Sequence, residues 1–137
     1  MNPRKAFSLA FLVGCGLMPP LTLGASPEIA IDPLLTRILA RDPNAEVQMF
    51  TVTFAPGAAD PIHRHDAQAF LYVLEGEIVM QVKGSAPVRL KPGQTFYESP
   101  TDVHVVGRNA SESSPARFLV VLIKQRGAPL LTVVPER

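Results

Sequence analysis

The feature that most constrains the fold of this chain is how often proline and glycine interrupt it. Fourteen prolines and nine glycines occur among 137 residues, and both residue types end regular elements or turn the chain. The runs between them are rich in β-branched and aromatic residues and partly alternate in polarity. They predict strands at residues 46–54, 62–65, 69–74, 77–82, 88–91, 95–99, 103–108 and 117–124. Short strands at this spacing predict an all-β sandwich or barrel.

Composition and charge limit the classes of protein to which the chain can belong. It is 47% apolar and carries 13 basic against 12 acidic side chains. This content is typical of one globular domain and not of a disordered chain. Because the charges nearly balance, the sequence lacks the strongly basic character of a nucleic-acid-binding protein. We therefore expect no nucleic-acid partner and a small-molecule ligand instead.

Residues 1–25 are predicted to be a signal peptide. Arg4 and Lys5 form a short basic region, the stretch from Ala6 to Met18 is apolar, and small residues follow a pair of prolines. The apolar stretch is shorter than the roughly 20 residues that a transmembrane helix needs, so no integral membrane span is expected in the mature form. The protein is therefore predicted to be periplasmic or secreted.

An alternative interpretation of the same region involves the single cysteine. The sequence LVGC, which ends at Cys15, resembles a bacterial lipobox, in which Cys15 would be acylated and would anchor the protein to a membrane. The residues after Cys15 are apolar, whereas a lipoprotein usually carries a polar tether there. Cleavage near Gly24 or Ala25 is the preferred interpretation, and it would leave a mature chain without cysteine.

Residues 26–45 are predicted to form an N-terminal segment with a short helix, and residues 46–137 to form the main domain. Apolar residues between Pro33 and Ala40 recur at helical spacing, and Asp32 followed by a proline is a plausible helix start. We expect this helix to cover one end of the barrel.

The placement of the three histidines indicates a metal site. His63 and His65 are separated by one residue in a predicted strand, so their side chains project from the same face. Two imidazoles at this spacing can chelate one ion, although the pattern alone is also compatible with a structural or surface role. His104 follows a turn on a later strand, from which it can supply a third ligand in an antiparallel barrel.

In the order and spacing of these residues, the sequence resembles the cupin family. Two family motifs are matched in order, the first by Gly57, His63, His65 and Gly76, and the second by Gly93, Pro100 and His104. The resemblance implies a double-stranded β-helix, or jelly roll, whose barrel mouth holds a divalent metal ion on the two motif strands. Imidazole ligands suit iron, manganese, nickel, copper and zinc alike, so the identity of the metal stays open.

The sequence departs from the family at the position of the metal-binding glutamate. That glutamate precedes the last glycine of the first motif by seven residues, and Ala69 stands there. Gln68 is one residue out of phase and would face inward only at a β-bulge. Glu98 shares the parity of Phe96, whose counterparts in the family face the barrel, and it is the predicted catalytic residue, as a metal ligand or as a hydrogen-bond partner of one. The alternative is that Tyr97 faces inward and Glu98 faces solvent.

The predicted site is compatible with two classes of function. Three neutral imidazoles leave the charge of a dication uncancelled, which favours an anionic bidentate ligand and leaves coordination positions open. The arrangement is similar to that of the three-histidine cupin dioxygenases, so one hypothesis is a metal-dependent dioxygenase-like enzyme that acts on a small chelating molecule. The other is a non-catalytic small-molecule or metal-binding module, because a fold does not determine a function.

Two further expectations concern apolar surfaces. The aromatic residues Phe70, Tyr72, Phe96 and Tyr97 can line an apolar pocket, or they can simply belong to the core. Residues 117–124, or the C-terminal run LLTVV, can present an exposed strand edge that pairs across a homodimer.

Overall fold

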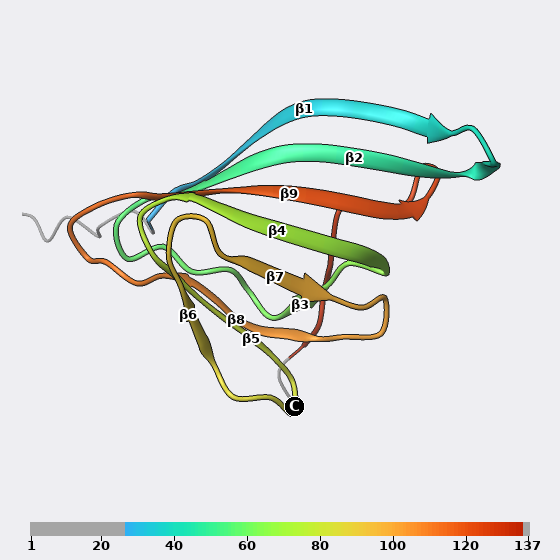
Figure 1. Cartoon of the computed structure of the whole chain (residues 1–137). Helices are drawn as coiled ribbons and strands as arrows, with labels where there is room; N and C mark the ends of the chain where they lie inside the picture. The colour runs from blue at the N-terminus through green and yellow to red at the C-terminus, as the bar shows by residue number, and fades with distance from the viewer. Residues whose placement is uncertain (1–26, 136–137) are drawn as a thin grey trace, which may run out of the picture.

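The computed structural model describes residues 27–135, which form two five-stranded antiparallel sheets (Figure 1). No helix occurs in this part of the chain. The first sheet has the order β1-β2-β9-β4-β7, and the second has the order β10-β3-β8-β5-β6. The strands are β1 (Ile29–Leu39), β2 (Asp42–Phe54), β3 (His63–Arg64), β4 (Ala67–Glu75), β5 (Ile78–Val82), β6 (Val88–Leu90), β7 (Thr95–Glu98), β8 (His104–Asn109), β9 (Ala116–Gln125) and β10 (Thr132–Val133). The predicted all-β jelly roll is confirmed.

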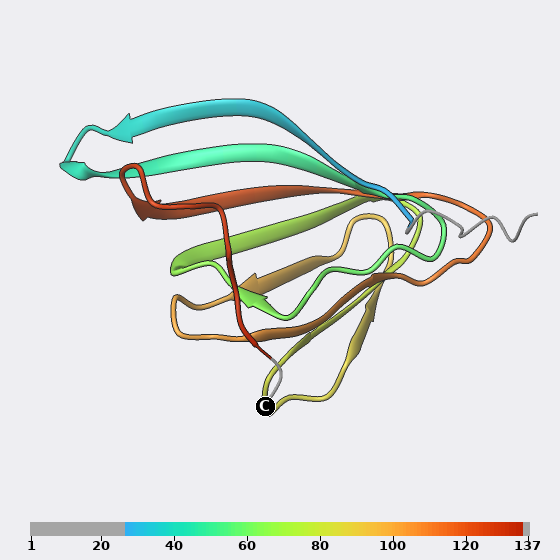
Figure 2. The ribbon, with the colours of Figure 1, turned by 180° about the vertical axis from the view of Figure 1, so that it is seen from behind.

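The two sheets converge at one end of the molecule and separate at the other (Figures 1 and 2). The segment after β9 leaves the first sheet at the wider end and crosses to the second sheet, where β10 pairs with β3 (Figure 1). This crossing brings Leu130, just before β10, within hydrogen-bond distance of His65, which follows β3.

The short helix predicted in residues 26–45 is wrong, because the residues expected to form it lie in the strand β1 (Ile29–Leu39). It pairs antiparallel with β2 along nearly its whole length, beginning with Ile29 opposite Phe54. A register shift lies between Pro33 and Leu35, and a shift of this kind interrupts the two-residue alternation expected of a strand. β1 is an edge strand, where a proline without a backbone N–H is tolerated. Pairing with a long neighbouring strand decides the conformation here.

The apolar core lies between the two sheets. On β4 every second residue from Ala67 to Val73 is buried, and the residues between them are exposed. Phe54 and Phe118 meet edge to face with ring centroids 5.1 Å apart, a preferred arrangement of aromatic pairs. Each fully buried large apolar side chain contributes about 1.5–3 kcal/mol to folding.

The strand order determines which edges are free to pair. β9 lies inside the first sheet between β2 and β4, so the expectation that residues 117–124 form an exposed edge is wrong. The outermost strands are β1 and β7 in the first sheet and β10 and β6 in the second. Within residues 27–135, no helix is long and apolar enough to cross a membrane.

A buried asparagine joins three parts of the chain. Asn109, at the end of β8, is 1% exposed. Its Nδ2 donates to the carbonyl oxygens of Phe54, Ala55 and Ser114 at 3.2, 3.0 and 2.9 Å. Its Oδ1 accepts a hydrogen bond from the backbone N–H of Ser111 at 2.9 Å. The side chain therefore holds the end of β2 and the loop before β9 against the end of β8.

Candidate metal centre

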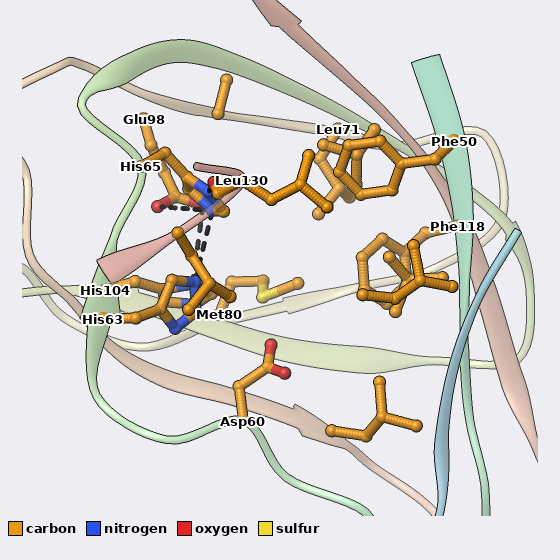
Figure 3. A pocket seen from close by; sticks show the side chains of 16 residues that line it. Phe50, Asp60, His63, His65, Leu71, Met80, Glu98, His104, Phe118 and Leu130 are labelled. Atoms are coloured by element: carbon orange, nitrogen blue, oxygen red, sulfur yellow. Dashed lines mark hydrogen bonds and ion pairs between the residues drawn. The ribbon is translucent and has the colours of Figure 1, made fainter. Parts of the chain in front are cut away.

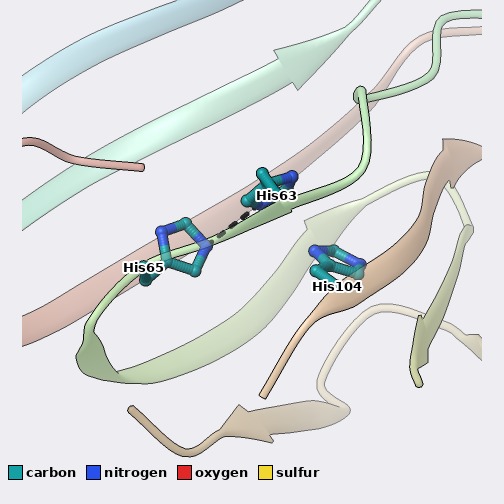
Figure 4. Close-up of side chains that lie close together, drawn as sticks. All are labelled: His63, His65 and His104. Carbon is teal, nitrogen blue, oxygen red and sulfur yellow. Dashed lines mark hydrogen bonds between the residues drawn. The ribbon is translucent and has the colours of Figure 1, made fainter. Parts of the chain in front are cut away.

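The structure brings the three histidines of the two motifs together. His63 is on β3, His65 follows it directly, and His104 begins β8. His63 and His104 are partners across the antiparallel β3–β8 ladder, and the ring of His63 lies 4.8 Å from each of the other two, measured between centroids. One nitrogen from each ring can be chosen so that all three lie within 4.8 Å of one another (Figure 4). Such a group of nitrogens can hold one metal ion.

The remaining nitrogen of each ring is held by a backbone carbonyl. His63 Nδ1 lies 2.8 Å from the oxygen of Pro61, and His65 Nδ1 lies 2.7 Å from that of Leu130. His104 Nε2 lies 2.6 Å from the oxygen of Val106. Because a carbonyl only accepts, each of these nitrogens carries the proton, and the opposite nitrogen of a neutral ring keeps its lone pair. Hydrogen bonds of this kind orient metal-ligating histidines.

The lone-pair nitrogens satisfy the chemical requirements of a metal site. His63 Nε2 and His65 Nε2 lie 3.2 Å apart, and two lone pairs at this distance repel unless a cation lies between them. His104 Nδ1 is buried and has no hydrogen-bond partner within residues 27–135. A buried nitrogen without a partner is costly, and a metal ion would remove that cost. The three donors therefore fit a divalent transition metal.

Burial favours the neutral form of two of these imidazoles. Burial and the neighbouring His63 and His65 together lower the pKa of His104 to about 4, against the opposing effect of the hydrogen bond to the Val106 carbonyl. Burial also lowers the pKa of His65, although the hydrogen bond to the Leu130 carbonyl opposes the change. Both rings are therefore in the form that binds a metal at neutral pH.

Glu98 points into the barrel beside the histidines, in the orientation expected from its parity, whereas Tyr97 is exposed. Glu98 Oε1 lies 3.6 Å from His104 Nδ1, and Glu98 Oε2 lies 3.9 Å from His65 Nε2. Burial, together with the carboxylates of Asp102 and Asp60, raises the pKa of Glu98 to about 7.

Ala69 and Gln68 occupy opposite faces of β4. Ala69 is buried and Gln68 is exposed. The register of β4 with β9 is regular until after Val73, so no bulge turns Gln68 inward. The side chain of Gln68 therefore points away from the histidines, so of the two substitutes considered from the sequence, Glu98 is the one that lies beside them.

The histidines and Glu98 lie on one side of a small cavity that opens to solvent. Apart from Asp60, its other walls are apolar and come mainly from the first sheet, and Met80, Leu130 and Leu131 add to them from outside that sheet (Figure 3). The lining side chains include Phe50, Val52, Leu71, Phe118 and Val120. The cavity therefore presents an apolar wall opposite the histidines, so a ligand at the histidines would contact apolar side chains.

The aromatic residues considered in the sequence do not line this cavity. Phe70, Tyr72 and Tyr97 are exposed and lie instead along a groove on the outside of the first sheet. Phe96 packs against the edge of the core. The aromatic wall of the cavity comes from Phe50 and Phe118.

Asp60 is a second carboxylate in the cavity that the sequence analysis missed. It lies in the loop between β2 and β3, its backbone N–H donates to the carbonyl of Gly107 at 2.7 Å, and its side chain points into the cavity (Figure 3). Burial raises the pKa of Asp60 to about 6, although His63 opposes the increase. Outside a strand there is no side-chain alternation from which to infer its orientation, and proximity to the first histidine pair is the one sequence signal.

A small jelly roll with a histidine cluster inside its barrel defines a class of single-domain β-barrel proteins with an internal binding site. The cupin domain model (Cupin_2) matches residues 50–122, more than half of the chain. The chain therefore belongs to the cupin family, as its motifs indicated.

Individual relatives are similar over part of their length. Auxin-binding protein T85 of Nicotiana tabacum is 31% identical over 86 residues, which cover 56% of this chain and 46% of that protein. The chain thus spans less than half of this curated relative. The structure of oxalate oxidase in complex with the substrate analogue glycolate has a TM-score of 0.60 and 25% identity, covering 78% of this chain and 55% of the other. A cupin-like protein from Thermotoga maritima has a TM-score of 0.62 at 21% identity, covering 79% and 77%, a likeness of fold.

Proposed function

We propose that this protein is an exported, metal-dependent cupin enzyme that acts on a small chelating molecule, in the manner of a dioxygenase. The observation that carries the proposal is the convergence of one ring nitrogen from each of His63, His65 and His104 at one cavity. A divalent ion bound there would supply Lewis-acid or redox chemistry to an oxygen-donor ligand. The identity of that ion among iron, manganese, nickel, copper and zinc is a matter for measurement.

The residues of the chain account for binding and orientation of such a ligand. The apolar walls exclude water and strengthen electrostatic interactions at the histidine end. The Asp60 carboxylate faces the same space and can accept a hydrogen bond from a hydroxyl or amine of the ligand. The likeness to oxalate oxidase bound to glycolate supports a ligand of small size with anionic oxygen donors.

Elemental analysis of protein purified without chelator or affinity metal tests the site. We expect near-stoichiometric metal that is lost in the His104→Ala variant. Oxygen consumption by the iron-loaded protein, measured with diketones, catechols and thiols, then tests the activity. Metal-dependent turnover that disappears in His104→Ala supports the enzyme. Absence of metal in both proteins, together with failure to bind added iron, manganese or zinc, contradicts the proposal.

A non-catalytic binding module is the second candidate. It is favoured by the name of the curated relative, an auxin-binding protein, which describes binding and not turnover. Under this hypothesis, the metal-loaded protein binds a small organic acid tightly in calorimetry and returns it unchanged. Conversion of the bound molecule, followed by chromatography, would exclude the module.

Export is part of the proposal and concerns residues outside the part of the chain that the structure describes. The supporting pattern is the basic and then apolar sequence of residues 1–25. Intact mass spectrometry of the exported protein distinguishes the alternatives. A new N-terminus near Ala25 supports cleavage of a signal peptide, and a lipid-modified Cys15 supports membrane anchoring in its place.

A further inference from the structure

Ala69 stands where the cupin family has a metal-binding glutamate, and the residue opposite Ala69 in the sheet is itself a glutamate. Ala69 on β4 is the direct partner of Glu98 on β7 in the antiparallel ladder. Both side chains are buried, at 4% exposed each. Side chains that are direct partners on the same face lie about 4.5–5.5 Å apart at Cβ. A carboxylate on β7 can therefore reach a site that a carboxylate on β4 would also reach.

The Glu98 carboxylate is directed at the nitrogens that are available to a metal. Its two oxygens lie 3.6 Å from His104 Nδ1 and 3.9 Å from His65 Nε2 (Figure 3). These are the lone-pair atoms of the two rings, because their other nitrogens are bonded to carbonyls. Both distances are too long for hydrogen bonds. They suit ligands of one ion, since two atoms each about 2.0–2.2 Å from a metal lie at most about 4.4 Å apart.

The surroundings offer Glu98 no other cationic partner. Within residues 27–135, its ion-pair contacts are with the two histidines, and no lysine or arginine nitrogen lies within 4.0 Å of it. A buried carboxyl group either takes up a proton or needs a cation to neutralise its charge. A dication between the carboxylate and the imidazoles would do so.

We propose that Glu98 is a direct metal ligand, which supplies from β7 the carboxylate that Ala69 does not supply from β4. This inference rests on the metal site of the proposed function and adds a fourth protein ligand to it. A dication held by three neutral imidazoles and one carboxylate keeps a net positive charge, so the site still favours an anionic small molecule.

The first test is metal affinity in Glu98→Gln, which keeps the size of the side chain and removes its charge. Titration calorimetry with Zn²⁺ and with Mn²⁺ is expected to show that metal affinity is lowered at least about 10-fold. Changes to groups that only orient a ligand already lower metal affinity by about this factor, and loss of a ligand should lower it at least as much. The visible absorption spectrum of the Co²⁺-loaded protein is expected to change as well, because it depends on the ligand set. Unchanged affinity and an unchanged Co²⁺ spectrum would overturn the inference.

The second test moves the carboxylate back across the ladder. In the Glu98→Ala background, Ala69→Glu is expected to restore metal affinity, because its side chain occupies the facing position on the same side of the sheet. Gln68→Glu in the same background is the matched control. It adds the same charge on the exposed face of β4 and should not restore binding. Equal restoration by both variants would mean that charge alone, and not ligation, is responsible.

The outcomes separate this inference from the metal site itself. If the unaltered protein binds Zn²⁺ and Mn²⁺ no better than His104→Ala does, the metal site and the inference both fail. If binding depends on His104 but is the same in Glu98→Gln, the three-histidine site stands and Glu98 is not a ligand. Circular dichroism of each variant verifies that the fold is retained, and Glu98→Gln decides the matter if the double variant does not fold.

Discussion

Replacing Gly107 by alanine tests whether the position of the His104 ring controls metal binding. Gly107 is on β8, and a Cβ added there would lie 2.8 Å from His104 Cε1 and 2.9 Å from Asp60 Oδ2. Ordinary van der Waals contact begins at 3.4 Å, so the ring must move by about 0.6 Å to avoid steric repulsion. The backbone of Gly107 has no positive φ, and alanine can adopt it without strain.

A displacement of this size should weaken the site without unfolding the barrel. Changes to groups that orient metal-ligating histidines lower metal affinity by about 10–100-fold. At a metal concentration about 100 times the Kd of the unaltered protein, bound metal stabilises that protein by about 2.7 kcal/mol. At the same concentration, the weakened variant would gain only about 0.4–1.4 kcal/mol.

Thermal unfolding with and without added Zn²⁺ measures this difference. Taking roughly 4 °C for each kcal/mol in a domain of this size, metal should raise the Tm of the unaltered protein by about 11 °C and that of Gly107→Ala by about 2–6 °C. Gly84→Ala is the control, because its φ of +88° strains an alanine while nothing lies within 4 Å of the added Cβ. It should lower both Tm values and keep the full metal-dependent increase. A full increase in Gly107→Ala would refute the reasoning.

Three further predictions concern the stability of the fold. Asn109→Asp loses the amide that donates to three carbonyls and should lower the free energy of unfolding in urea by about 2–4 kcal/mol; an unchanged value would contradict this. The hydrogen bond from Lys124 Nζ to Glu46 holds the pKa of that carboxyl below its ordinary value. The pair therefore adds stability above the ordinary pKa that is lost as pH falls through the lowered one. Acid unfolding followed by circular dichroism should lose this component in Glu46→Gln, and an identical pH profile would argue against the pair. Leu122→Ala, at a fully buried position, should cost about 2–5 kcal/mol, against at most about 0.5 kcal/mol for the exposed Leu34→Ala; equal costs in urea unfolding would contradict the assignment of the core.

The features that could be predicted from the sequence are those that follow local rules. The strand pattern follows from the alternation and from the prolines and glycines between the runs. The convergence of His63, His65 and His104 was predicted from strand parity and from the two motifs. The inward orientation of Glu98 also follows from parity, because β7 is regular up to that residue.

The features that could not be predicted depend on which segments pair. Whether the segment after Ile29 is a helix or a strand is decided by its long neighbour β2, because its own apolar spacing resembles a helix. The pairing of Ala69 with Glu98 depends on sheet register, which the sequence does not state. The carbonyl that orients His65 belongs to Leu130, 65 residues away along the chain. Likewise, Phe50 and Phe70 both lie in alternating strands, and only the packing of the sheets determines that the first lines the cavity.

The burial of Asn109 has a consequence for how the protein can be produced. Asn109, Ala110 and Ser111 match the acceptor pattern for N-linked glycosylation, a modification that attaches a bulky sugar to the same Nδ2 atom that here donates to three carbonyls. Once the barrel has formed, that atom is out of reach of any glycosyltransferase. A sugar attached to the chain before folding would keep the side chain outside and leave those carbonyls without their donor. In a eukaryotic secretory host, glycan occupancy at Asn109 would therefore identify molecules that have not reached this fold.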